Sequence, residues 1–101
     1  MTENNGVLEG FTCQVLPEWI DYNGHMNVAF YVLAFDKATD ALLDHLGMDA
    51  AYVKGRNNST FVVEMNVSYL REVHEGDRLR FTTQVLGRAD KKLHFYHRMY
   101  H

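Results

Sequence analysis

A short polar run between two apolar segments brings together the side chains best suited to chemistry. Within residues 21–27 (DYNGHMN), Asp21, His25 and Asn27 supply a carboxylate, an imidazole and an amide. A carboxylate such as Asp21 can act as a general base toward water or as a nucleophile toward a carbonyl carbon. Because Asp is also common in turns, a turn or capping role for Asp21 is the structural alternative.

The residues that follow predict a helix able to position this run. Asn27 is a suitable N-cap, the helix body covers residues 28–46, and Gly47 is a natural C-terminal stop. A helix N-terminus favours an ionised carboxylate nearby, and its unpaired N–H groups, such as that of Val28, can polarise a carbonyl oxygen. The first two turns are apolar all round, which predicts that both sides of the helix start are covered.

Other residues of the run have a structural interpretation beside a functional one. Gly24 permits either a close approach by a ligand or an ordinary tight turn. His25 either orients a carboxylate or substrate, or bonds to the backbone, and Asn27 is either a helix cap or a catalytic amide. Cys13, the single cysteine, has no obvious activating base and is not expected to be a nucleophile.

The composition fits one globular domain. The chain has 101 residues, 47% of them hydrophobic and 23% charged, with a formal net charge of -3. This balance predicts no nucleic-acid partner, and the longest apolar run (residues 28–35) is far below the roughly 20 residues of a membrane span. We predict a cytoplasmic protein without a membrane partner. His94, His97 and His101 lack the spacing of metal ligands, so no metal or other cofactor is expected.

Hydrophobic alternation after the helix predicts an antiparallel sheet, because short turns join neighbouring strands. The predicted elements are a flexible arm at 1–10, strands at 11–16, 60–71, 78–87 and 92–101, a short helix at 48–53, and turns at 72–77 and 88–91. The long helix is the one element able to cover the sheet. The predicted class is α+β, with residues 11–101 as one domain whose sheet wraps around a central helix.

This order and the loop sequence resemble the hotdog fold, in particular the 4-hydroxybenzoyl-CoA thioesterase-like family. The matching features are D-x-x-G-H-x-N at residues 21–27, the aromatic helix start at Phe30 and Tyr31, and V-V-E…Y-L-R…G-D over residues 62–77. The sequence is also similar to the betainyl-CoA thioesterase branch. The family pattern includes one more C-terminal strand than the sequence printed above.

The resemblance implies an acyl-CoA thioesterase that works as a homodimer or homotetramer, with sites shared between subunits. Asp21 would be the nucleophile or general base, and the Val28 N–H would bind the thioester oxygen. Gly24, His25 and Asn27 would complete the catalytic loop. Glu64 would take part in catalysis or position the substrate, with a structural pair as the alternative.

Substrate contacts are expected from two further groups of residues. Trp19 and Tyr22 flank Asp21 and could line an acyl pocket suited to a quaternary ammonium group, with core packing as the alternative for Trp19. Basic side chains at strand ends and turns could bind the CoA phosphates or simply be solvated. These basic residues are Arg71, Arg88, Lys91 and Lys92.

Two other functions stay open. Hotdog enoyl-CoA hydratases resemble D-x-N-P-x-H, whereas this chain has Gly24 in place of the proline and His25 one residue too close to Asp21. A non-catalytic acyl-CoA-binding module is the other alternative. Release of a free thiol separates hydrolysis from both.

Overall fold

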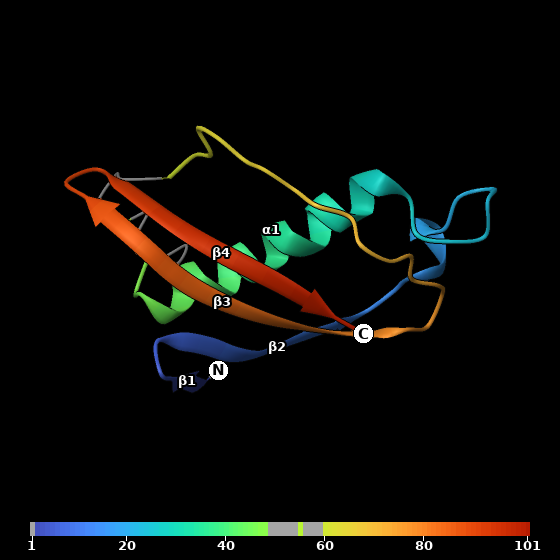
Figure 1. Cartoon of the computed structure of the whole chain (residues 1–101), viewed down its shortest axis with the longest axis horizontal. Coiled ribbons are helices and arrows are strands. Elements are labelled where there is room, and N and C mark those ends of the chain that lie inside the picture. The colour runs from blue at the N-terminus through green and yellow to red at the C-terminus, as the bar shows by residue number, and fades with distance from the viewer. Residues whose placement is uncertain (1, 49–54, 56–59) are drawn as a thin grey trace.

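A computed structural model describes residues 2–48, 55 and 60–101 of the chain. In this part, four antiparallel strands and one long helix form the regular structure (Figure 1). The sheet order is β1-β2-β3-β4, and α1 covers one face. The elements are β1 (Thr2–Asn4), β2 (Val7–Gln14), the short 3-10 helix η1 (Pro17–Trp19), α1 (Val28–His45), β3 (Arg78–Ala89) and β4 (Lys92–Tyr100).

Both ends of α1 lie where the sequence predicts them. At the start, the side-chain oxygen of Asn27 accepts a hydrogen bond from the N–H of Ala29 at 2.9 Å. At the end, Gly47 adopts a φ of +81° and the N–H of Met48 bonds to the carbonyl of Leu43 at 2.8 Å. Such a left-handed residue closes the last turn because its missing Cβ removes the steric penalty. The N-cap and glycine-stop predictions are confirmed.

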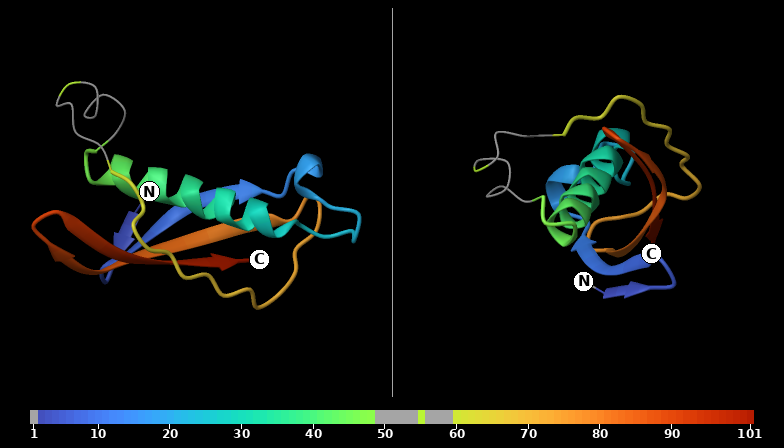
Figure 2. Two further views of the ribbon diagram at one scale, coloured as in Figure 1. Left: turned by 90° about the horizontal axis from the view of Figure 1, so that it is seen from above. Right: turned by 90° about the vertical axis from the view of Figure 1, so that its left-hand side faces the viewer.

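Small residues let α1 lie close against the sheet. Its buried face is formed by Tyr31, Ala34, Ala38 and Leu42. Phe35 adds an edge-on ring contact with Phe81 of β3, with ring centroids 5.7 Å apart. Seen along its axis, α1 lies within the curve of the sheet (Figure 2). The outer side of the helix start stays open, since Val28 is 60% and Leu33 39% exposed, which contradicts the predicted cover on both sides.

The first ten residues form sheet rather than the predicted flexible arm. β1 pairs antiparallel with β2, with Asn4 opposite Val7. Asn5 and Gly6 join the strands with φ angles of +52° and +77°. Positive φ at both positions is the geometry of a two-residue hairpin turn, for which Asn-Gly is the strongest sequence signal. In the sequence, this Asn-Gly pair lies among polar residues whose composition favours a flexible arm.

A β-bulge in β2 explains the imperfect alternation of its sequence. The pairing with β3 shifts between Glu9 and Phe11, so that Gly10 is an extra residue, with a φ of +113°. Leu8 is buried and Phe11 packs on the core. These two apolar residues are therefore three apart instead of two, because the bulge absorbs one position.

Residues 60–71 do not form the predicted strand. They are extended, but within the described part of the chain residues 60–70 make no backbone hydrogen bond. Alternation is a property of one segment, whereas a strand also needs a neighbour to pair with. The outer edge of β4 is likewise unpaired among the described residues. The α+β hotdog class is confirmed by the remaining architecture. The short helix predicted at 48–53 lies, apart from Met48, outside the described residues.

Candidate active site

Residues 21–27, here called the 21–27 loop, form a tight turn held by its own polar groups. The backbone N–H of Asp21 bonds to the carbonyl of His25 at 3.2 Å, and that of Gly24 bonds to the carbonyl of Asp21 at 3.0 Å. Gly24 has a φ of +86°, and a Cβ placed there would meet no atom within 4 Å. Within this chain, Gly24 is therefore required by the backbone conformation and not by a crowded contact.

The carboxylate of Asp21 lies between the turn and the start of α1. Its Oδ1 accepts a hydrogen bond from the N–H of Asn23 at 2.8 Å. Its Oδ2 accepts a longer one, 3.4 Å, from the side-chain amide of Asn27. Asn27 thus joins the helix cap to the carboxylate. An ionised carboxylate has about four acceptor positions, so Asp21 keeps lone pairs for a further partner.

The first turn of α1 contains a backbone donor that has no partner among the described residues. The N–H of Ala29 bonds to the Asn27 side chain and that of Phe30 to the Asn27 carbonyl. The N–H of Val28 has no partner among the described residues. A free N–H at a helix N-terminus can stabilise negative charge on a carbonyl oxygen. The structure therefore places an available donor one residue after Asn27, whose amide binds Asp21.

A second segment, residues 71–77, fixes the loop to the core. The N–H of Met26 bonds to the carbonyl of Val73 at 2.9 Å. The hydroxyl of Tyr31 accepts from the N–H of Val73 at 3.2 Å and lies 3.3 Å from the carbonyl of Arg71, to which it donates. Burial raises the pKa of Tyr31, so this hydroxyl stays protonated and available as a donor. These bonds set the position of the loop relative to α1.

Glu72 is a site neighbour that the sequence interpretation missed. Its two carboxylate oxygens lie 3.6 Å from Nε2 of His25 and 3.5 Å from Nε2 of His74, as ion pairs when the imidazoles are protonated. The ring of His25 therefore faces Glu72, and among the described residues it makes no hydrogen bond or ion pair with Asp21. Glu72 directly follows Arg71, the last residue of the Y-L-R pattern, and this position beside the pattern was the available signal.

The aromatic residues predicted to line an acyl pocket lie in different environments. Trp19 is 4% exposed and stacks on Phe30, with ring centroids 5.9 Å apart. This position matches the core-packing alternative. Tyr22 is 97% exposed at the tip of the loop, directly after Asp21. Of the two rings, Tyr22 is the one free to meet a ligand.

Among the described residues, no hydrogen bond or ion pair joins the predicted charged residues to Asp21. Glu64 and Arg71 are exposed, Glu64 within the unpaired 60–70 segment. Arg88, Lys91 and Lys92 are also exposed and lie around the turn that joins β3 to β4. That turn and the 21–27 loop are at opposite ends of the molecule (Figure 1).

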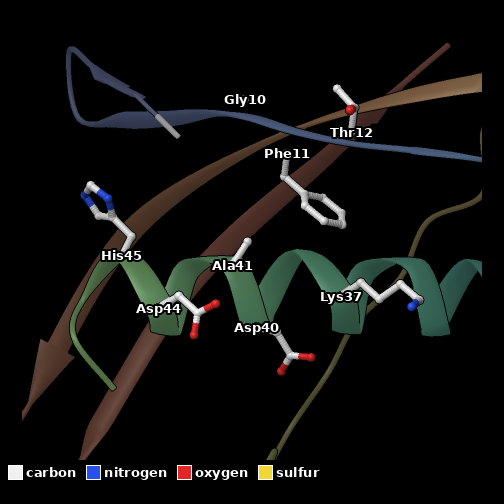
Figure 3. Close-up of a pocket in the computed structure, with 8 residues that line it drawn as sticks. All are labelled: Gly10, Phe11, Thr12, Lys37, Asp40, Ala41, Asp44 and His45. Atoms are coloured by element: carbon white, nitrogen blue, oxygen red, sulfur yellow. The ribbon is translucent and has the colours of Figure 1, made fainter. Parts of the chain in front are cut away.

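A broad hollow of about 670 Å³ lies away from the 21–27 loop, between α1 and β2 (Figure 3). Phe11 points toward the helix there, whereas the carboxylates of Asp40 and Asp44 point away from the strand. None of the residues that line it belongs to the loop. It is therefore not part of the candidate site.

The remaining nucleophile and metal-ligand candidates are in structural surroundings. Burial raises the pKa of the Cys13 thiol, opposed by the charge of Lys37, which disfavours the reactive thiolate. His97 lies between two hydroxyls, with Nε2 2.8 Å from Thr39 and Nδ1 2.7 Å from Thr83. Among the described residues, no cluster of three or more His, Cys, Asp or Glu is placed to hold a metal ion.

No helix in the described ranges is both long and apolar enough to span a membrane.

Comparison with known families gives a consistent match. A family model described as "Thioesterase-like superfamily" matches residues 15–101. A betainyl-CoA thioesterase of Pseudomonas aeruginosa is 46% identical over 94 residues, which cover 93% of this chain and 59% of that protein. An L-carnitine dehydrogenase/betainyl-CoA thioesterase of Ruegeria pomeroyi is 43% identical over 83 residues, 82% of this chain and 17% of that protein.

Solved structures share the architecture. A crystal structure of a proposed thioesterase from Pseudomonas putida KT2440 superimposes with a TM-score of 0.83 at 42% identity, over 93% of this chain and 61% of that one. A Staphylococcus aureus hypothetical protein in complex with CoA gives a TM-score of 0.86 at 24% identity, over 98% and 61% of the two chains, and supports the fold alone. The chain spans about three-fifths of the length of the first of these relatives and of both structures.

Proposed function

The chain belongs to the thioesterase-like superfamily, and on that premise we propose that it hydrolyses a small acyl-CoA thioester to the free acid and CoA. One observation carries the proposal. The carboxylate of Asp21 is joined through Asn27 to the start of α1, where the N–H of Val28 has no partner among the described residues. A carboxylate and a free backbone donor are the two groups that acyl transfer from a thioester needs.

In the proposed reaction, the thioester oxygen accepts a hydrogen bond from the N–H of Val28. Asp21 either attacks the carbonyl carbon or removes a proton from a water molecule that attacks it. Negative charge collects on the oxygen in the tetrahedral intermediate, near the positive end of the helix. The C–S bond then breaks and CoA leaves as the thiolate. If Asp21 is the general base, it passes the proton taken from water to this thiolate and is again a carboxylate. If Asp21 is the nucleophile, water hydrolyses the resulting mixed anhydride and restores the carboxylate.

The other loop residues would set the geometry of this reaction. Asn27 caps α1 and donates to Asp21, so one side chain fixes the carboxylate relative to the helix N-terminus. Gly24 provides the backbone conformation that closes the turn. The ring of His25 lies beside Glu72, with its Nε2 3.6 Å from the carboxylate. In this proposal, His25 and Gly24 position the loop and Asp21 carries out the chemistry.

For the acyl group we propose a small acyl chain that carries a quaternary ammonium. The relatives that support this class are those described as betainyl-CoA thioesterases. In this chain, the exposed ring of Tyr22 lies next to Asp21. An aromatic face attracts a quaternary ammonium group, and this attraction is lost with a neutral acyl group of the same size.

We propose that two copies assemble to complete the site. Six exposed apolar side chains lie on the unpaired segment and are here called the apolar strip: Phe61, Val62, Val63, Met65, Tyr69 and Leu70. Contiguous exposed apolar surface of this kind is typical of a protein interface. A second copy that covers the strip could bring Arg88, Lys91 and Lys92 toward the CoA phosphates near Asp21, which a single chain does not do. Glu64 lies on the same segment and would be close to this interface.

The decisive experiment is a thiol-release assay with a panel of acyl-CoAs that includes betainyl-CoA and a neutral acyl-CoA of similar size. We expect the wild type to release thiol, and Asp21→Asn to lower kcat by roughly 10²–10⁴-fold, the usual share of a positioned base. Asp44→Asn, an exposed carboxylate on α1, is the matched control and keeps wild-type rates.

The possible results separate the competing functions. Loss of enoyl absorbance without thiol would identify a hydratase. CoA-dependent stabilisation without turnover would identify a binding module. An active Asp21→Asn variant would remove Asp21 from its proposed role, even if hydrolysis itself is found.

A further inference from the structure

The face of the sheet opposite α1 carries a cluster of arginine and tyrosine side chains. On β3 and β4, Arg80 is paired with Tyr100, Thr82 with Arg98, and Gln84 with Tyr96. Phe81, between Arg80 and Thr82, packs on α1, so the alternating residues of β3 point to the other side of the sheet. Arg80 and Arg98 are therefore diagonal neighbours on adjacent strands and can reach a common ligand.

Tyrosine rings hold both guanidinium groups in place. The guanidinium carbon of Arg80 lies 4.1 Å from the centre of the Tyr100 ring, and that of Arg98 lies 5.4 Å from the centre of the Tyr96 ring. The pKa of the Tyr100 hydroxyl is lowered, chiefly by the neighbouring guanidinium of Arg98. Side chains held in this way lose less conformational freedom when they bind a ligand.

Among the described residues, this cluster carries more positive than negative charge. Among the described residues, neither Arg80 nor Arg98 takes part in an ion pair. Both line a hollow of about 370 Å³ that also contains polar groups and a single carboxylate, that of Glu9. The hollow is lined by Asn5, Val7, Glu9, Arg80, Thr82, Gln84, Tyr96, Arg98 and Tyr100. Its lining has a net positive charge, although the whole chain has a formal net charge of -3.

We propose that Arg80 and Arg98 form a binding site for a small phosphate-bearing anion on this outer face of the sheet. Guanidinium groups present several N–H donors in a plane that matches phosphate oxygens, and Thr82 and Gln84 add neutral polar groups. A second copy of the same face is a poor occupant, because four arginines would then meet. The site is separate from the proposed hydrolysis at Asp21, since none of its lining residues belongs to the 21–27 loop.

The test is a calorimetric titration of the full chain with inorganic phosphate and with pyrophosphate, at constant ionic strength adjusted with sodium chloride. We expect saturable binding, tighter for pyrophosphate, because it carries more charge. Arg80→Gln combined with Arg98→Gln should weaken it at least tenfold. Arg78→Gln is the matched control, because it removes the same charge from the same strand but lies outside the hollow; it should change the affinity less than twofold.

Two results would overturn the proposal: no saturable binding by the wild type, or an equal loss in Arg78→Gln, which would mean that general charge attraction accounts for the binding. A second measurement keeps the test valid if the double variant fails to fold. Amide chemical shifts of the wild type should move on addition of pyrophosphate at Thr82, Gln84 and Arg98. Shifts confined to the 21–27 loop or to the turn at residues 88–92 would place the anion elsewhere and contradict the proposed site.

Discussion

Two irregular segments of the chain differ in their hydrogen bonds and in the burial of their side chains. The 21–27 loop is joined to residues 71–77 by the backbone hydrogen bond between Met26 and Val73, which are 1% and 5% exposed. Residues 60–70 make no backbone hydrogen bond within the described part of the chain, and Phe61 and Leu70 are 84% and 89% exposed. Neither segment is a helix or strand. The 21–27 loop is fixed to the core, whereas residues 60–70 expose their apolar side chains to solvent.

The difference shows what an irregular segment needs to be well defined. In the loop, polar groups form hydrogen bonds with residues only a few positions away. The side chain of Met26 and that of Val73, to which it is bonded, are buried in the core. In the 60–70 segment, the alternation of side chains is that of a strand, but strand hydrogen bonds come from a neighbour. The hydrogen bonds of the loop come from nearby residues, whereas a strand needs hydrogen bonds from a second strand. The apolar strip is therefore the part of the molecule most dependent on a partner.

A charge placed in the apolar strip should have the largest effect on assembly. Val63→Lys introduces an ammonium group at a 75% exposed position that the proposed dimer would bury. Burying an unpaired charge is costly, so we expect the dissociation constant of the dimer to rise at least about a hundredfold. Sedimentation velocity measures it, and Thr12→Lys, at an exposed position outside the strip, is the control. A wild type that stays monomeric at high concentration would refute the proposed assembly.

Acid should loosen the helix–sheet body to which both segments are attached. The pKa of His97 falls from 6.5 to about 4 because burial disfavours the charged ring. The unfolded chain then binds a proton at higher pH than the folded one. Stability is fully present above pH 6.5 and falls as the pH drops toward 4, with a slope of at most one proton.

Thermal unfolding between pH 4 and 7.5 checks this expectation. His97→Gln should flatten the dependence, whereas the exposed His94→Gln should keep it. An unchanged slope in His97→Gln would assign the acid sensitivity to other groups.

Removing one hydroxyl should weaken the tie between α1 and residues 71–77. In Tyr31→Phe, the N–H of Val73 loses its acceptor at a buried position. An unsatisfied buried donor costs about 1–3 kcal/mol of unfolding free energy. Denaturant unfolding gives the loss, and hydrogen exchange should show a faster amide at Val73. Tyr69→Phe, whose ring packs edge-on against Tyr31 at 5.3 Å, is the control and should be nearly neutral.

The smallest effect is expected at Glu72. Glu72→Gln removes the charge opposite His25 and His74, but all these side chains are partly or largely exposed. Exposed ion pairs contribute about 0–1 kcal/mol, and this one exists only when an imidazole is protonated. Thermal unfolding should therefore show only a small loss of stability in this variant. A large loss would show that Glu72 has a role other than this pairing.

The parts of the structure that local chemistry determines could be predicted from the sequence. Asn27 and Gly47 bound the helix as expected, because a cap and a left-handed stop depend on neighbouring residues alone. The strand at 60–71 could not be judged, because its formation depends on a pairing partner. Glu72 was missed for a related reason, since its contact with His25 joins segments distant in the chain. The hairpin at Asn5 and Gly6 depends on these two residues alone, so it could have been predicted from the Asn-Gly pair.

The bulge at Gly10 has a consequence for changes in chain length. Gly10 is the extra residue between Glu9 and Phe11, so the side chains of these two residues point to opposite faces of β2. Deletion of Gly10 would make the alternation regular and leave Leu8 and Phe11 facing α1. Insertion of a residue elsewhere in β2 would instead exchange the faces of every residue beyond it. Gly10 is thus a position in β2 at which one residue can be deleted without moving buried side chains to the exposed face.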